Sequence, residues 1–162
     1  MSALPLSRVS AGILRDAAGR VLIAQRPAGK HMAGWWEFPG GKAADGESGP
    51  HALARELAEE LGVRIGPCHR LLELRHDYAD RSVVLDVYIV ADYAGEPQGL
   101  EGQALKWVEP AALGAEALLP ADRPIVEALL RALTRSAARD ATGQHPTAAI
   151  APDAPTAVRA GA

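Results

Sequence analysis

The sequence is poor in features that mark several classes of protein. Its 162 residues include a single cysteine, Cys68, which excludes an internal disulfide framework and a multi-cysteine zinc site. No apolar run approaches the roughly 20 residues needed to span a bilayer. The N-terminal segment 1–8 lacks the charged and apolar regions of a secretory signal. We therefore expect a cytoplasmic protein that does not contact membranes.

The chain also lacks an excess of basic residues. Its formal net charge is −3, which argues against a general electrostatic binder of nucleic acid. The segment between positions 37 and 60 holds only two basic residues, Lys42 and Arg55. The same segment holds six acidic residues, namely Glu37, Asp45, Glu47, Glu56, Glu59 and Glu60. A polyanionic substrate would avoid such a surface unless divalent cations neutralised it.

The hydrophobic content of 48% is sufficient for one packed domain. Alternating and apolar runs predict strands over 7–14, 21–25, 35–38, 70–76, 82–91 and 104–108, with a hairpin through 77–81. Helices are predicted over 51–61 and from 122 or 124 to 134. This order of elements predicts a mixed α/β sandwich, with helices that cover a curved sheet.

The ends of the first helix and of the domain are marked in the sequence. Ser48 is a candidate N-cap, Pro50 suits the first turn, and Gly62 suits a left-handed C-terminal cap. Segment 135–162 is dominated by Ala, Thr, Pro and Gly, and it holds too few apolar residues to offset its chain entropy. We therefore predict a domain over 1–134 and a disordered tail over 135–162.

Three carboxylates lie on one face of the first predicted helix. Glu56, Glu59 and Glu60 have the spacing i, i+3, i+4 that brings side chains together on a helix. Such carboxylates repel one another, and a hard cation bound between them would offset the repulsion. The structural alternative is a solvated acidic helix face, which is common.

The surrounding pattern resembles the signature of the Nudix hydrolase family. Gly41 is followed after five residues by Glu47 and after seven more by Arg55, which opens the run Arg-Glu-apolar-x-Glu-Glu-x-Gly-apolar. All defined positions are filled, by Gly41, Glu47, Arg55, Glu56, Leu57, Glu59, Glu60, Gly62 and Val63. The resemblance implies an α/β/α sandwich with a loop–helix–loop motif. It also implies an enzyme that hydrolyses a nucleoside diphosphate linked to another group.

The resemblance further implies a bound divalent metal, Mg²⁺ or Mn²⁺. The expected ligands are one backbone carbonyl and four carboxylates, those of Gly40, Glu56, Glu59, Glu60 and Glu101. Glu56 is also expected to activate the attacking water, with Arg55 and Glu47 as supports.

The segments that flank the signature include Gln25-Arg26, Glu37-Phe-Pro-Gly-Gly-Lys42 and Asp80-Arg81. With the other flanking residues, they resemble the bacterial MutT-type 8-oxo-dGTP diphosphatases, without gaps from about Pro5 to Leu133. This resemblance implies that an oxidised purine nucleoside triphosphate is cleaved to the monophosphate and pyrophosphate. The reaction would remove an oxidised, mispairing precursor before DNA synthesis. We also expect a monomer that does not bind nucleic acid directly. The expected substrate-contacting residues are Arg26, Glu37, Phe38, Tyr78, Arg81 and Asp122.

Some of these residues have structural alternatives. Phe38 is explained about equally well as a core residue beside Trp35 and Trp36, which are expected to pack. Arg81 also suits an ordinary turn, and Glu101 a solvated loop. His31 and His51 lack metal-ligand spacing and are expected to have surface or packing roles.

Asp122 stands where the type member of the resembled group has Asn. An amide donates to O6 of 8-oxoguanine and accepts from N7–H, whereas an ionised Asp only accepts. The base is then held by a protonated Asp122 or in a different way. The alternatives at the level of function are another Nudix substrate, such as ADP-ribose, a dinucleoside polyphosphate or a pyrimidine triphosphate, and a catalytically silent nucleotide sensor.

Overall fold

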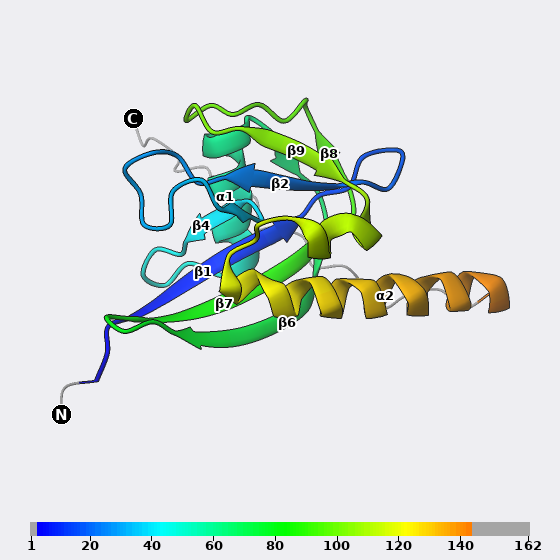
Figure 1. Ribbon diagram of the computed structural model, residues 1–162. Coiled ribbons are helices and arrows are strands. Elements are labelled where there is room, and N and C mark those ends of the chain that lie inside the picture. The colour runs from blue at the N-terminus through cyan, green and yellow to red at the C-terminus, as the bar shows by residue number, and fades with distance from the viewer. Residues whose placement is uncertain (1–2, 144–162) are drawn as a thin grey trace, which may run out of the picture.

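The computed structural model describes residues 3–143, which form a mixed α/β fold (Figure 1). The strands are β1 (Leu6–Ile13), β2 (Val21–Gln25), β3 (Trp36–Glu37), β4 (Gly40–Lys42), β5 (Arg64–Ile65), β6 (Cys68–Asp77), β7 (Ser82–Val90), β8 (Tyr93–Ala94) and β9 (Leu105–Val108). The helices are α1 (Gly49–Leu61) and α2 (Arg123–Thr142), with short 3-10 helices η1 (Pro110–Ala115) and η2 (Pro120–Asp122). Within residues 3–143, no helix is long and apolar enough to cross a membrane.

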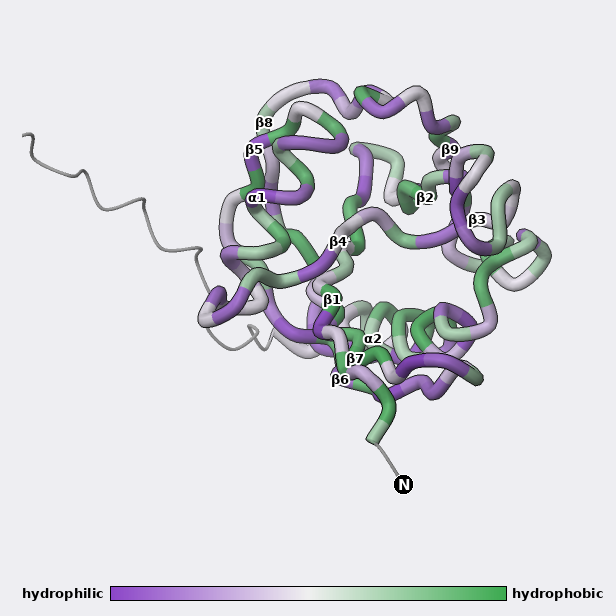
Figure 2. Tube along the Cα trace, turned by 90° about the vertical axis from the view of Figure 1, so that its left-hand side faces the viewer, coloured by the Kyte–Doolittle hydropathy of each residue, from purple (hydrophilic) through white to green (hydrophobic). Residues whose placement is uncertain are grey.

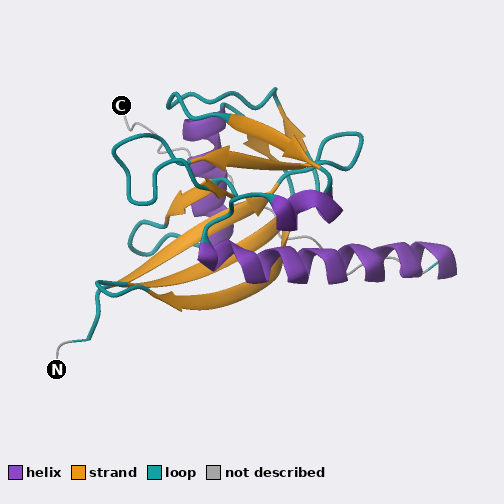
Figure 3. Ribbon diagram, viewed as in Figure 1, coloured by secondary structure: helices purple, strands orange, loops and turns teal. Residues whose placement is uncertain are grey.

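The main sheet is mixed and has the strand order β4-β1-β7-β6. β1 pairs in parallel with β7, whereas β4 and β6 each pair antiparallel with their neighbour. β3, β2 and β9 form a second, antiparallel sheet, and β5 pairs with β8. Helix α1 lies behind the strands and α2 crosses in front of them (Figure 3). The sandwich expected from the sequence is therefore confirmed.

Each helix covers its own hydrophobic core. Leu53, Leu57 and Leu61 of α1 pack with a cluster that includes Leu22 and Tyr88. Gly12 of β1 allows this close approach, because a Cβ there would lie 3.1 Å from Leu53 Cδ1. In the turned view, β1 passes between the two helices (Figure 2).

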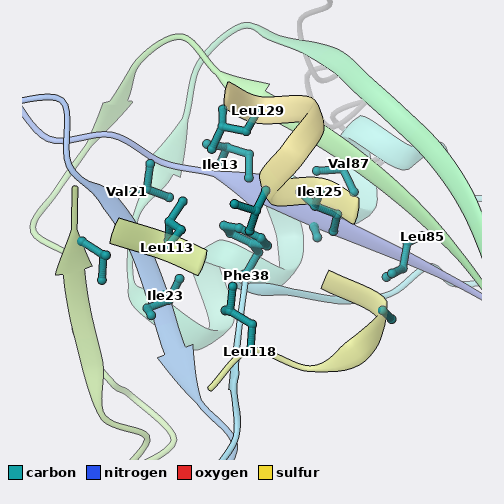
Figure 4. Close-up of a cluster of buried hydrophobic side chains, with 14 residues drawn as sticks. Ile13, Val21, Ile23, Phe38, Leu85, Val87, Leu113, Leu118, Ile125 and Leu129 are labelled. Atoms are coloured by element: carbon teal, nitrogen blue, oxygen red, sulfur yellow. The ribbon is translucent and has the colours of Figure 1, made fainter. Parts of the chain in front are cut away.

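Helix α2 packs on the opposite core. Its residues Ile125 and Leu129 contact a cluster that contains Ile13 and Val87, with Phe38 near the centre (Figure 4). These side chains are almost completely buried. The two clusters pack α1 and α2 against strands of the main sheet.

Several elements differ from the prediction, and β5, β8 and the two 3-10 helices were not expected. No strand was expected between residues 38 and 51, but residues 40–42 form β4, which pairs with β1. β4 contains two glycines and no β-branched residue, so side-chain preference gives no strand signal. Helix α2 continues to Thr142, past the expected end at Thr134, and Gly143 caps it in the left-handed conformation. Residues 144–162 of the expected tail lie outside the described residues.

The neighbouring residues Trp35 and Trp36 have different environments. Trp36 is half-buried against the α2-side core, and the Lys106 ammonium lies 4.7 Å from the centre of its ring. Trp35, by contrast, is 38% exposed, so the expected packing role is wrong for this residue. Trp36, its neighbour on β3, is the residue that packs against the core.

Candidate active site

Helix α1 begins as its capping residues predict. The Ser48 hydroxyl oxygen accepts from the backbone N–H of His51 at 3.3 Å, and Gly62 adopts a left-handed conformation at the other end. The buried leucines of the helix face the core, which leaves the glutamates on the remaining faces. The buried leucines therefore fix the direction in which the acidic residues point about the helix axis.

Arg55 connects the loop before α1 to the helix. Its Nε and Nη2 donate to the two carboxylate oxygens of Glu47 at 2.8 and 3.0 Å. The guanidinium also donates to the Lys42 carbonyl oxygen and to Glu56, each at 2.9 Å. The hydrogen bonds from Arg55 and from the Ala44 N–H lower the pKa of Glu47 to about 2. Arg55 thus contacts Glu56 directly, and Glu47 is linked to Glu56 through Arg55.

Glu56 lies against strand β4. A Cβ added at Gly41 would overlap the Glu56 carboxylate, and a Cβ added at Gly40 would overlap the carbonyl oxygen of Ser10. Gly40 also has a φ of 156°, a backbone conformation that residues with a side chain rarely adopt. The two glycines therefore let β4 lie between β1 and the carboxylate of Glu56.

Glu60 is the most perturbed carboxyl of the helix. Burial, followed by the negative charges of Glu101, Glu56 and Glu37, raises its pKa to about 8. Its shift shows that the loop containing Glu101 and the strand containing Glu37 bring like charges to the end of α1. Glu59 differs, because its side chain is 59% exposed and contacts Arg55 at 3.4 Å.

The expected metal ligands are near one another without converging. Within residues 3–143, no three His, Cys, Asp or Glu side chains are grouped closely enough to hold an ion. One cause is that Glu56 is bound to Arg55. The donor chemistry nevertheless fits a hard divalent cation, because the carboxylate oxygens around Glu60 repel one another and a cation relieves that repulsion. Cys68, a soft ligand, is buried in the α1-side core.

A cavity of about 250 Å³ borders β4, the strand against which Glu56 lies. All six residues expected to contact substrate line it, namely Arg26, Glu37, Phe38, Tyr78, Arg81 and Asp122. Gly40 and Lys42 of β4 line it as well. The cavity and the acidic helix are thus joined through β4, whose middle residue Gly41 lies against Glu56.

Arg26 and Glu37 form one wall of the cavity. Arg26 Nη1 donates to Glu37 at 2.9 Å, and Arg26 Nε donates to the carbonyl oxygen of His31 at 2.7 Å. Burial raises the pKa of Glu37, although the charge of Arg26 opposes the shift. The same arginine therefore supports a cavity-lining carboxylate and the loop over residues 27–34.

Tyr78 forms an aromatic surface on another wall. His31 and His76 lie edge-on to its ring, with centroid separations of 5.9 and 4.6 Å, and the Arg81 guanidinium is 5.3 Å from the ring centre. His31 and Met32 also line the cavity, although His31 was expected to have a surface or packing role. A lone histidine in a loop carries no spacing signal, so sequence reasoning had no means of finding it.

Asp122 lies at the buried end of the cavity. Asp122 is 5% exposed, and its Oδ2 accepts from the backbone N–H of Phe38 at 3.1 Å. Within residues 3–143, the other carboxylate oxygen has no hydrogen-bond partner. Burial raises the pKa of Asp122 to about 7, against the effect of the Phe38 hydrogen bond. An acid with a free oxygen therefore faces a space that a ligand can enter.

Phe38 has both of the roles considered for it. Its ring is 4% exposed and belongs to the α2-side core, and the residue also lines the cavity. Its backbone N–H holds Asp122. Neither Trp35 nor Trp36 lines the cavity.

Comparison with known proteins identifies the family. The family model for the NUDIX domain matches residues 10–128. The 8-oxo-dGTP diphosphatase of Escherichia coli (strain K12) is 37% identical over 126 residues, which cover 76% of this chain and 96% of that protein. The CTP pyrophosphohydrolase of the same strain is 41% identical over 122 residues, which cover 75% of this chain and 89% of that protein.

A solved structure shares the fold. The solution structure of the E. coli ORF135 protein superposes with a TM-score of 0.72 at 38% identity, and the match covers 85% of this chain and 96% of that chain. The residues 10–128 that match the family model include helix α1 and the six cavity-lining residues expected to contact substrate. The chain belongs to the NUDIX domain family.

Proposed function

We propose that this protein hydrolyses 8-oxo-dGTP, or a related oxidised purine nucleoside triphosphate, to the monophosphate and pyrophosphate. The observation that carries the proposal is that β4 borders both the cavity and the acidic helix. Gly40 and Lys42 line the cavity together with Asp122 and Tyr78, and Gly41 lies against Glu56. Family membership and the relatives that are named 8-oxo-dGTP diphosphatase support a hydrolase acting on pyrophosphate bonds.

The cavity suits the base of a nucleotide. Its volume of about 250 Å³ lies just below the roughly 300–1,000 Å³ typical of pockets for whole small molecules. The Tyr78 ring offers a surface for stacking. In the protonated form, Asp122 donates from its free oxygen to O6 of an oxidised purine, while the Phe38 N–H fixes the carboxyl group.

We propose Mg²⁺ as the physiological metal, with Mn²⁺ as a substitute. The residues that would hold it are Gly40, Glu56, Glu59, Glu60 and Glu101. When bound, such a cation screens the phosphate charge and lowers the pKa of a coordinated water. Glu56 takes up the proton of the attacking water at its carboxylate, and Arg55 orients that carboxylate through its 2.9 Å hydrogen bond.

A second candidate substrate is a cytosine nucleotide. An ionised Asp122 accepts from the exocyclic N4 amine of cytosine, which is a known pairing of carboxylates with that base. The relative named CTP pyrophosphohydrolase supports this candidate. The protonation state of Asp122 thus separates the two substrates: the acid donates to an oxopurine and the carboxylate accepts from cytosine.

A nucleotide panel tests the proposal. The protein is incubated with Mg²⁺ and 8-oxo-dGTP, dGTP, CTP or ADP-ribose, and the products are identified by chromatography and mass spectrometry. We expect 8-oxo-dGMP and pyrophosphate at a much higher kcat/KM than for dGTP. Preference for CTP would support the second candidate, and preference for ADP-ribose would contradict both. The absence of turnover would favour a silent nucleotide sensor.

We also propose that the protein acts as a monomer in the cytoplasm. The cavity and the acidic helix are formed by residues of one chain. Sedimentation of the purified protein across a concentration series tests the monomer, and a dimer at micromolar concentration would contradict it.

A further inference from the structure

The loop over residues 98–103 is attached to the C-terminal end of α1. The backbone N–H groups of Gln98 and Leu100 donate to the carbonyl oxygens of Leu61 and Glu60, at 3.0 and 3.1 Å. Carbonyls in the last turn of a helix have no partner within the helix. The loop therefore supplies the donors that the end of α1 lacks.

Gln103 makes this attachment through its side chain. Its Nε2 donates to the carbonyl oxygen of Glu60 at 3.1 Å, while its Oε1 accepts from the backbone N–H of Glu101 at 2.9 Å. Because an N–H must face the amide oxygen, the Glu101 contact fixes which way the amide points. One amide group thus joins α1 to the backbone of Glu101.

The loop is tightly folded around this amide. Gly102 has φ of 78° and donates from its N–H to the Gly99 carbonyl oxygen at 3.0 Å. A Cβ at Gly99 would overlap the carbonyl oxygen of Gln103, so the two backbones are in contact. Glu101 is at the tip of this turn, between Gly99 and Gly102.

We propose that Gln103 is a positioning residue that holds Glu101 beside Glu60, so that carboxylates from the loop and the helix serve one divalent cation. This inference rests on the proposed function, because it takes the two glutamates as metal ligands. The Gln103 amide contacts the backbone of both glutamates and neither carboxylate directly. Its effect is therefore on where Glu101 lies, and the donor set itself is unchanged.

Manganese binding by the nucleotide-free protein tests the inference. Free Mn²⁺ is measured by electron paramagnetic resonance during a titration, so the result does not depend on turnover. Gln103→Leu removes both hydrogen bonds and keeps most of the side-chain volume. We expect it to weaken Mn²⁺ binding by roughly tenfold or more, which is the usual effect of losing a residue that orients a ligand. Gln98→Leu is the matched control, since Gln98 is exposed in the same loop.

A double variant separates positioning from general destabilisation. Glu101→Gln removes the carboxylate and keeps the backbone N–H that Gln103 holds. If Gln103 acts through Glu101, then Gln103→Leu has no further effect on Mn²⁺ affinity in the Glu101→Gln background. Additive losses would overturn the inference, as would an unchanged Mn²⁺ affinity in Gln103→Leu alone.

The same titration distinguishes this inference from the proposed function. A wild-type protein that binds no Mn²⁺ would remove the metal site and both proposals with it. A wild-type protein that binds Mn²⁺ as tightly as Gln103→Leu would overturn the inference and leave the proposed function standing. Circular dichroism of each variant establishes that it is folded before its affinity is compared.

Discussion

The carboxylate of Glu56 lies directly against the Cα of Gly41, so that a side chain at position 41 would occupy the same space. Glu56 is also held by Arg55 at 2.9 Å. The carboxylate is therefore confined between a strand and a guanidinium. This confinement gives the first prediction.

Gly41→Ala is expected to lower kcat by about tenfold to a hundredfold. The added methyl group displaces the Glu56 carboxylate, and small displacements of a positioned group are costly in catalysis. Gly114→Ala is the control, because a Cβ there has no neighbour within 4 Å. Steady-state kinetics of the two variants check the prediction. Equal kcat values in both would show that the position of Glu56 is not limiting.

Glu56→Gln is expected to lower kcat by about 10²–10⁴-fold, the range that general base catalysis usually contributes. The amide keeps the size and shape of the side chain but cannot take up a proton. The thermal unfolding temperature is expected to stay close to that of the wild type. Glu127→Gln, on an exposed face of α2, is the control. Near-normal turnover in Glu56→Gln would remove this residue from its proposed role.

Asp122→Asn is expected to change the pH dependence of stability. The pKa of Asp122 is about 7 in the folded protein against an ordinary value of 3.8, so the folded state binds the proton more tightly. Its stabilising contribution is complete below pH 3.8 and is lost as pH rises to about 7. The Asn variant, which has no such proton, should gain stability relative to wild type by about 1.4 kcal/mol per pH unit within this window. Urea unfolding at several pH values measures the difference, and a constant difference would contradict the pKa.

The same residue predicts a pH-dependent choice of base. As pH rises from 6 to 8, Asp122 loses the proton that donates to an oxopurine and becomes an acceptor for cytosine. The ratio of kcat/KM for 8-oxo-dGTP to that for CTP should therefore fall in the wild type. In Asp122→Asn the ratio should be flat, since the amide does not titrate in this range. A parallel fall in both proteins would assign the effect to another group.

Glu47→Gln is expected to reduce the acid sensitivity of the fold. The pKa of Glu47 is about 2 when folded and near 4.5 when unfolded, so its contribution is present above pH 4.5 and is lost as pH falls through 2. The free energy of unfolding should thus decrease more steeply in the wild type between pH 5 and 2 than in the variant. Asp45→Asn, in the same loop, is the control. Identical slopes for wild type and Glu47→Gln would show that the Arg55 pair does not contribute.

Much of the motif could be predicted because its signals are local. The N-cap at Ser48, the glycine after Leu61 and the leucine spacing determine where α1 begins, ends and faces, and each is visible within a few residues. The hairpin of β6 and β7 was predicted for the same reason. Local signals of this kind depend on backbone geometry, which neighbouring residues largely decide.

The rest depends on contacts between distant segments. β4 is a strand because the backbone of β1 pairs with it, and its own Gly-Gly-Lys sequence gives no sign of this. The 84-residue separation of Phe38 and Asp122 hides the hydrogen bond that fixes the acid. The last turns of α2 are exposed, so no apolar periodicity marks them, and helix-favouring Ala and Arg residues extend the helix beyond its buried part.

The segment from Phe38 to Gly41 has a consequence for how such an enzyme diversifies. Phe38 holds the cavity-lining acid Asp122, and Gly41 touches the carboxylate of Glu56. They are three residues apart in a chain whose bond lengths are fixed, a reach of at most about 10 Å. The segment therefore limits the distance between the group that holds Asp122 and the group that contacts Glu56. Substitutions around the base can change which nucleotide is selected while the cut falls at the same distance from it.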